Sequence, residues 1–94
     1  MRRLVWSSTF HRALRRTLRR QPNLRGEIDS TLRSLSEEPF APELATHKLK
    51  GKLRGTWACS VAYDLRILFE FVPSEEGGED DVFLIEIGSH DEVY

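Results

Sequence analysis

The chain has 94 residues, of which 39% are hydrophobic and 31% are charged, a balance that excludes a disordered chain and predicts one globular domain over residues 1–94. The formal net charge is −1, and one cysteine, Cys59, can form neither an internal disulfide nor a Cys-based zinc site alone. No apolar run approaches the roughly 20 residues that a membrane-spanning helix needs, and no secretory signal is recognisable, so we expect a cytoplasmic protein with no membrane partner.

The first half of the chain predicts a short strand followed by a helical hairpin. Residues 2–6 alternate in polarity, and Ser7 and Ser8 suit a helix N-terminus. Apolar side chains then recur at helical spacing up to residue 18, and Pro22 predicts a helix end at Arg20 or Gln21. Pro22 also suits the first turn of a second helix. The apolar stripe of that helix is Leu24, Ile28, Thr31, Leu32 and Leu35.

The second half predicts strands. Residues 36–46 contain two prolines and are expected to form a loop. Period-two alternation with β-branched and aromatic side chains then marks residues 56–61, 66–71 and 83–87, and the acidic stretch 72–81 would connect the last two strands. We therefore expect a small α+β domain: an N-terminal strand, a helical hairpin and a three-stranded antiparallel meander, with both helices on one face of the sheet. A core this small favours a shallow groove over a deep site.

Charge is segregated along the chain. Residues 1–25 contain eight arginines and no acid, and a second basic run follows at Lys48, Lys50, Lys52 and Arg54. Beyond residue 54, Arg66 is the only base among ten acids. Such segregation indicates that a polyanion or an acidic partner meets one face. The alternative for the N-terminal arginines is a solvated helix face.

Two internal stretches contain residues that could act on a nucleic acid. In the stretch 47–55 (HKLKGKLRG), an extended backbone would project three lysines to one side as a track for phosphates, although lysines also protect edge strands from aggregation. In the stretch 63–71 (YDLRILFEF), Tyr63 and Asp64 would form a turn, and Asp64 would share a face with Arg66. Arginine can grip a phosphate through two parallel hydrogen bonds, but a surface ion pair between Asp64 and Arg66 is the alternative.

The C-terminal stretch 87–94 (IGSHDEVY) is the third candidate. His90 follows a strand end and a glycine, and an imidazole can donate or accept a proton near neutral pH. The ring of Tyr94 could stack on a base. The alternatives are a surface histidine and a tyrosine that closes the core. The three histidines lie far apart, with no spacing typical of metal ligands.

Taken together, these stretches resemble the RelE superfamily of toxins, and most closely its YafQ-like branch. The resemblance covers essentially the whole chain: a helical hairpin, a histidine loop, and strands that end in Gly-x-His and an aromatic residue. It implies a RelE-like fold and the toxin of a type II toxin–antitoxin system. It further implies a ribosome-dependent endoribonuclease, or mRNA interferase, that uses no metal or other cofactor and has a cognate antitoxin and mRNA on the ribosome as partners.

The resemblance also assigns roles to residues. The 2′-hydroxyl of the RNA would attack the adjacent phosphate, a reaction that needs a base, an acid and cations. His90 would be the general acid, His47 or Asp64 the base, and Tyr94 the ring that packs on the substrate base. Phosphate contact would come from Arg66. The residues expected to guide the RNA are Lys48, Lys50, Lys52 and Arg54.

The chain departs from the family pattern at two positions. YafQ-like members have a second histidine in the strand before the acidic residue, where this chain has Ser60. They also have an arginine just ahead of Gly-x-His, where we align Glu86. A carboxylate repels a scissile phosphate, so Arg66 could substitute, Glu86 could face away from the groove, or cleavage could be slow or absent. Two alternatives follow: a ParE-like toxin that poisons DNA gyrase without nuclease activity, and a degenerate homologue that retains only antitoxin binding.

Overall fold

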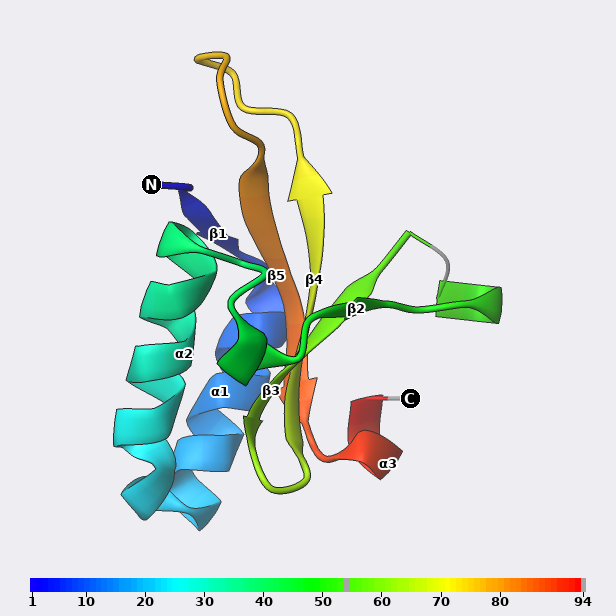
Figure 1. Ribbon diagram of the computed structural model, residues 1–94. Helices are drawn as coiled ribbons and strands as arrows, with labels where there is room; N and C mark the ends of the chain where they lie inside the picture. Colours follow the sequence, from blue (N-terminus) through cyan, green and yellow to red (C-terminus); the bar gives the residue numbers. More distant parts are fainter. Residues whose placement is uncertain (54, 94) are drawn as a thin grey trace.

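The fold is built on one five-stranded sheet in the order β1-β5-β4-β3-β2 (Figure 1). The computed structural model describes residues 1–53 and 55–93, without the side chain of Lys52. The strands are β1 (Leu4–Trp6), β2 (His47–Lys48), β3 (Trp57–Ala62), β4 (Leu65–Val72) and β5 (Asp81–Gly88). The pairs β2–β3, β3–β4 and β4–β5 are antiparallel, whereas β1 lies parallel to β5.

Two helices, α1 (Ser8–Arg20) and α2 (Arg25–Glu37), cover one face of the sheet, as expected (Figure 1). The Ser7 hydroxyl caps α1 by accepting the N–H of Phe10 at 2.9 Å. Helix α1 ends immediately before Gln21, because Pro22 disfavours helical geometry in the residue before it. The expected first turn of the second helix is a separate 3-10 turn, Pro22–Leu24, from which α2 continues.

The main core lies between the helices and the sheet. Its largest fully buried side chains include Phe10 from α1, Ile28 and Leu35 from α2, and Ile67 and Phe69 from β4. Each such side chain contributes about 1.5–3 kcal/mol through burial. The lone cysteine also belongs here: burial raises the pKa of the Cys59 thiol to about 12, so the group stays neutral and acts as a small apolar side chain.

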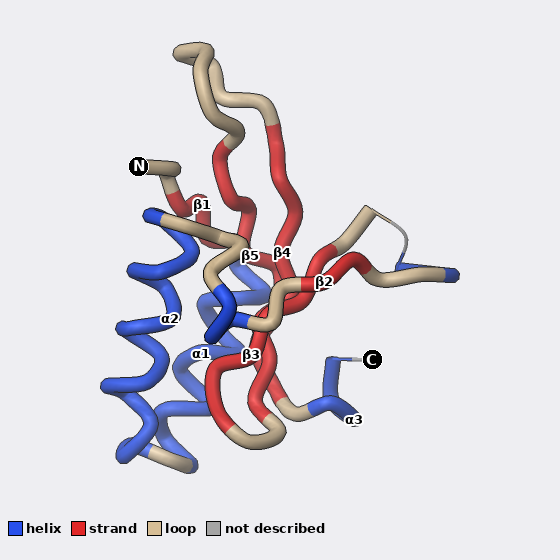
Figure 2. Tube along the Cα trace, in the orientation of Figure 1, coloured by secondary structure: helices blue, strands red, loops and turns tan. Residues whose placement is uncertain are grey.

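The opposite face of the sheet is only partly covered. A small apolar cluster of Ala58, Leu68 and Val93 lies there, with Leu49 and Ile85 packed against it. Val93 belongs to α3 (His90–Val93), a one-turn helix that the sequence did not predict. Figures 1 and 2 show α3 at one end of the sheet and the connection between β4 and β5 projecting from the other end.

Helix α3 is fixed to the end of β5 by close packing and by a reciprocal cap. A side chain at Gly88 would meet Glu92 at 3.1 Å, so only glycine lets α3 fold back here without displacement. The backbone N–H of Ser89 donates to Glu92 Oε1 at 2.9 Å, and the N–H of Glu92 donates to the Ser89 hydroxyl at 3.3 Å, which is a capping box. The Ser89 N–H holds the pKa of Glu92 below its ordinary value, and an ion pair with Arg20 at 3.2 Å adds to this effect.

Two expectations about the stretch 47–55 are wrong. The sheet has five strands because residues 47–48 add β2, whereas four strands were expected. The extended lysine track does not form, because extension ends after Lys48 and the chain turns through a 3-10 segment, Gly51–Leu53. Gly51 has a φ of 72°, a left-handed conformation that breaks the alternation of side chains. In the described part of the chain, no helix is long and apolar enough to cross a membrane.

Candidate functional site

An open pocket of about 540 Å³ lies where the turn between β3 and β4 meets the start of α3. Its lining residues are Ser60, Ala62, Tyr63, Asp64, Arg66, His90 and Asp91. Arg66 lies opposite Ser60 in the β3–β4 ladder, two residues from the pair Ala58–Leu68. Because side chains alternate along a strand, Ser60 and Arg66 share the sheet face that carries α3, and the pocket is on that face.

Asp64 and His90 meet in this pocket although 26 positions separate them. Asp64 occupies the turn with a φ of 57°, a left-handed conformation that aspartate tolerates better than most residues. Its Oδ1 accepts the backbone N–H of His90 at 3.2 Å. The carboxylate therefore joins the turn to the first residue of α3. The His90 side chain is 57% exposed, and its Nδ1 lies 3.8 Å from Asp91 Oδ1.

Arg66 contributes a partly buried cation to the same pocket. One terminal nitrogen of its guanidinium donates to the Ser60 hydroxyl at 3.4 Å, a long bond that leaves other N–H groups for a ligand. Among the described residues, no ion pair forms between Arg66 and Asp64, so the surface pair considered as an alternative is not present. The pocket thus combines a carboxylate, an imidazole and a guanidinium over a shallow surface, a set that can exchange protons and bind an anion.

His47 lies on the same face of the sheet but does not line the pocket. It is exposed on edge strand β2, opposite Ala58. With about 4.8 Å between strands and 3.4 Å per residue, its Cα lies about 12 Å from that of Arg66. The His47 Nδ1 is 3.0 Å from the carbonyl oxygen of Ala45. A carbonyl can only accept, so Nδ1 is the donor in this contact.

The basic residues expected to guide RNA do not gather in the pocket. Lys48 lies opposite Trp57, whose side chain packs against the main core, and its Nζ is 5.6 Å from the Trp57 ring centroid. It therefore lies on the helix-covered face. Lys50 is exposed in the following loop. Arg54, Tyr94 and the side chain of Lys52 lie outside the described residues. The structure therefore brings Asp64, Arg66 and His90 together, while His47, Lys48 and Lys50 lie apart from them.

Several residues that shape the pocket were not proposed from the sequence. Ser60 was noted only as a departure from the family, yet it lines the pocket and contacts Arg66. The spacing Ser89-x-x-Glu92 is a signal for a helix cap that could have predicted α3. Glu86 lies opposite Leu68 and therefore on the same face of the sheet as the pocket. Strand spacing places its Cα about 8 Å from that of Arg66. It does not face away from the groove.

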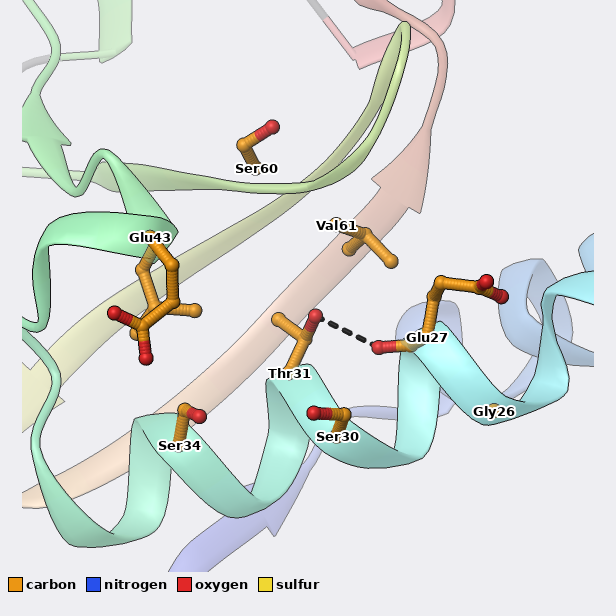
Figure 3. A pocket seen from close by; sticks show the side chains of 9 residues that line it. Gly26, Glu27, Ser30, Thr31, Ser34, Glu43, Ser60 and Val61 are labelled. Carbon is orange, nitrogen blue, oxygen red and sulfur yellow. Dashed lines mark hydrogen bonds between the residues drawn. The ribbon is translucent and has the colours of Figure 1, made fainter.

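A second pocket, of about 350 Å³, lies between α2 and the edge of the sheet (Figure 3). Its lining includes Glu27, Ser30, Ser34 and Glu43, and no histidine or basic residue among the residues that the structure describes. Ser60 borders both pockets, and Figure 3 shows its side chain directed away from α2. The carboxylates of the second pocket would repel an anion, and none of its described lining residues offers a positive charge to bind one. Within residues 1–53 and 55–93, no three His, Cys, Asp or Glu side chains are grouped to hold a metal ion.

Comparison with known proteins gives the chain a family context. A family model described as a bacterial toxin of type II toxin–antitoxin systems, YafQ, matches residues 2–94. No curated protein sequence matches the chain.

Solved structures match over nearly the whole length. The YoeB/ParE toxin from Agrobacterium tumefaciens is 23% identical with a TM-score of 0.76, covering 94% of this chain and 98% of its own. A metal-bound toxin from Helicobacter pylori is 26% identical with a TM-score of 0.70, covering 100% of both chains. The DinJ–YafQ complex of E. coli contains a chain that is 14% identical with a TM-score of 0.77, covering 100% of this chain and 99% of that one.

Proposed function

Because this chain belongs to the YafQ family of toxins from bacterial type II toxin–antitoxin systems, we propose that it is an endoribonuclease that cuts mRNA on the ribosome. The observation that supports this proposal is the convergence of Asp64, Arg66 and His90 on one open pocket. A shallow, exposed pocket suits a polymer, since a small substrate is usually enclosed by the site that binds it. Ribosomes are cytoplasmic, so the activity belongs in that compartment.

The proposed reaction is an internal transfer at phosphorus that needs no metal. The 2′-oxygen of the RNA loses its proton and bonds to the adjacent phosphorus, and the bond from phosphorus to the 5′-oxygen of the next nucleotide breaks. The products are a 2′,3′-cyclic phosphate and a 5′-hydroxyl. His90 donates the proton that the departing 5′-oxygen needs, and the Arg66 guanidinium stabilises the charge that develops on the phosphate.

We assign the base to Asp64 rather than to His47. Asp64 lines the same pocket as His90, and only its Oδ1 accepts the His90 N–H, which leaves Oδ2 able to take a proton. His47 lies on edge strand β2 outside the pocket, with its Cα about 12 Å from that of Arg66. A base must reach the proton within about 3 Å, or through one water. His47 then contacts the RNA beyond the scissile phosphate.

A cognate antitoxin is the expected protein partner. The matching family is defined by toxin–antitoxin systems, and one structure with the same fold is a complex of YafQ with DinJ. The antitoxin would hold the toxin inactive until it is removed. The functional test therefore requires expression of the toxin without its antitoxin.

Inducible expression of wild type, His90→Ala and His11→Ala tests the proposal, with translation rate and mRNA 5′ ends as readouts. His11 is the matched control, since it is an exposed histidine on α1, away from the pocket. The proposal predicts cleavage in phase with codons for wild type and His11→Ala, and its loss in His90→Ala. Growth arrest with intact mRNA and broken DNA would contradict it and favour a gyrase poison. Absence of any phenotype in wild type would indicate a toxin that no longer cuts.

A further inference from the structure

Tyr63 is an aromatic residue that the fold exposes completely. Its side chain is 101% exposed, and with Asp64 it forms the two-residue turn between β3 and β4. Such turns favour glycine, asparagine and aspartate, and Asp64 supplies the left-handed conformation here. Tyrosine favours strands, where its ring can pack against neighbours. The turn itself therefore does not explain an aromatic ring at this position.

The Tyr63 ring has no partner within the part of the chain that the structure describes. The ring of Trp6, which is also exposed, lies 5.3 Å from that of Phe10. The exposed ring of Phe40 lies 5.4 Å from that of Trp57. Tyr63 makes neither a ring contact nor a hydrogen bond with the described residues. Both faces of its ring can therefore receive a planar ligand, at a small entropic cost because tyrosine has only two side-chain torsions.

This ring borders the pocket proposed to cleave RNA. Tyr63 lines the same pocket as Asp64 and His90. Its Cα lies about 3.8 Å from that of Asp64, the proposed base, because the two residues are consecutive. In a nucleotide, the 2′-hydroxyl and the nucleobase are attached to adjacent carbons of one ribose. A nucleotide whose 2′-oxygen reaches Asp64 therefore brings its own base close to the Tyr63 ring.

The surroundings of the ring favour a nucleobase over a protein side chain. Apart from Ala62, the other described residues of the pocket are polar or charged. The remaining exposed large hydrophobic residues, Met1, Trp6 and Phe40, do not line it. Protein interfaces instead surround an aromatic anchor with well-packed neighbours. Single-stranded RNA is recognised by stacking of its bases on aromatic rings beside cations that contact phosphates, and Arg66 supplies such a cation here.

We propose that Tyr63 stacks on the nucleobase immediately 5′ of the cut and thereby helps to determine which codons are cleaved. This role rests on the proposed nuclease function. Purines offer a larger face for stacking than pyrimidines, so a purine is favoured at that position. The role is separate from the stacking that the resemblance assigns to Tyr94, which lies outside the described residues.

The fluorescence of 2-aminopurine, an adenine analogue whose emission is quenched by stacking, tests this proposal. The analogue replaces each base of the open codon in turn, in mRNA bound to ribosomes, and the His90→Ala background keeps the RNA intact. Adding protein should quench the analogue at the position 5′ of the cut mapped with wild type. Tyr63→Leu should abolish this quenching and weaken binding roughly 5- to 100-fold, the range for losing one stacked base. Tyr63→Phe keeps the ring and should retain both.

The control makes the same kind of substitution at another exposed aromatic residue. Phe40→Leu lies outside the pocket and should change neither quenching nor affinity. Thermal unfolding of each variant checks that the fold is retained. Undiminished quenching by Tyr63→Leu, equal losses in Tyr63→Leu and Phe40→Leu, or a loss in Tyr63→Phe would overturn the proposal. A protein that does not bind programmed ribosomes would overturn the nuclease function as well, whereas binding without quenching would overturn only the role of Tyr63.

Discussion

Asp64 combines a demanding backbone conformation with a structural and a proposed chemical role. Its positive φ of 57° closes the turn between β3 and β4, and its carboxylate accepts the His90 N–H. A substitution at this position can therefore fail for three different reasons. Variants that separate them are needed before a loss of activity is assigned to proton transfer.

Asp64→Asn separates these roles. Asparagine adopts left-handed conformations readily and its amide oxygen can still accept the His90 N–H, but it cannot take a proton. We expect thermal stability close to wild type with cleavage reduced about 10²- to 10⁴-fold, the range for losing a general base. Asp64→Ala should lose the same activity and also lower the free energy of unfolding by about 1–2 kcal/mol. Alanine disfavours the left-handed backbone of the turn and has no side-chain oxygen to accept the His90 N–H. Full activity of Asp64→Asn would show that His47 or another group is the base.

Glu86 introduces a negative charge on the face where the RNA phosphate is expected. Glu86→Gln removes this charge and should raise cleavage at subsaturating RNA by about two- to fivefold, the size expected for removing one repulsive unit charge near the surface. The gain should shrink as salt increases. Glu75→Gln in the connection between β4 and β5 is the control of equal charge. A decrease in cleavage by Glu86→Gln would show that the carboxylate takes part in the site.

Among the elements, α3 decides where His90 lies, and Gly88 decides where α3 lies. Gly88→Ala should displace α3, because the new Cβ would stand 3.1 Å from Glu92 Cβ and 3.2 Å from Val93 Cγ1. We expect the free energy of unfolding to fall by about 1–3 kcal/mol, measured by chemical unfolding. We also expect a loss of cleavage beyond what the smaller folded fraction explains, measured by an mRNA cleavage assay. Gly26→Ala meets no atom within 4 Å and should be neutral or slightly stabilising. Unchanged cleavage by Gly88→Ala would show that α3 does not position the acid.

The capping box makes α3 sensitive to acid. The pKa of Glu92 is lowered chiefly by the Ser89 N–H. The stabilisation of α3 by ionised Glu92 is therefore complete above the ordinary pKa of 4.5 and is lost as the pH falls through the lowered pKa. Hydrogen exchange at the Val93 amide, which donates to the Ser89 carbonyl at 3.1 Å, should therefore lose protection in that acid range. Glu92→Gln should show weak protection that does not change with pH. Protection that persists in acid for wild type would rule out this anchor.

The elements differ in how far sequence could predict them. Helices α1 and α2 and strands β3, β4 and β5 have enough residues for the period of their apolar side chains to identify them. Strand β2 and helix α3 are too short for any period, and they form because of contacts with β3 and β5. The predicted lysine track is wrong because it assumed that side chains alternate along an extended backbone through Gly51, where the chain turns.

The candidate site was predicted in part. Asp64, Arg66 and His90 were singled out within their stretches and given roles by the resemblance, and their meeting depends on the turn at Asp64 and on α3. The separation of His47 from this pocket depends on the order of strands, because β2 lies at the edge beyond β3. No local pattern in the sequence reports that order.

The molecule as a whole presents two surfaces with different chemistry. One face of the sheet carries the pocket of Asp64, Arg66 and His90, and the other is covered by helices whose outer side carries the exposed residues Arg12, Arg15, Arg16 and Arg19. Acidic residues concentrate at the connection between β4 and β5, which projects from the end opposite α3 (Figure 2). Although the net charge is only −1, positive and negative charges lie on different parts of the molecule, and this separation can orient the protein on a polyanion.

The chemical identity of the RNA ends produced by purified protein on mRNA-programmed ribosomes tests the proposed mechanism most directly. Attack by the 2′-hydroxyl predicts a 2′,3′-cyclic phosphate on the upstream fragment and a 5′-hydroxyl on the downstream one, with both products absent for His90→Ala. A 3′-hydroxyl on the upstream fragment with a 5′-phosphate on the downstream one would contradict catalysis by Asp64, Arg66 and His90 as described.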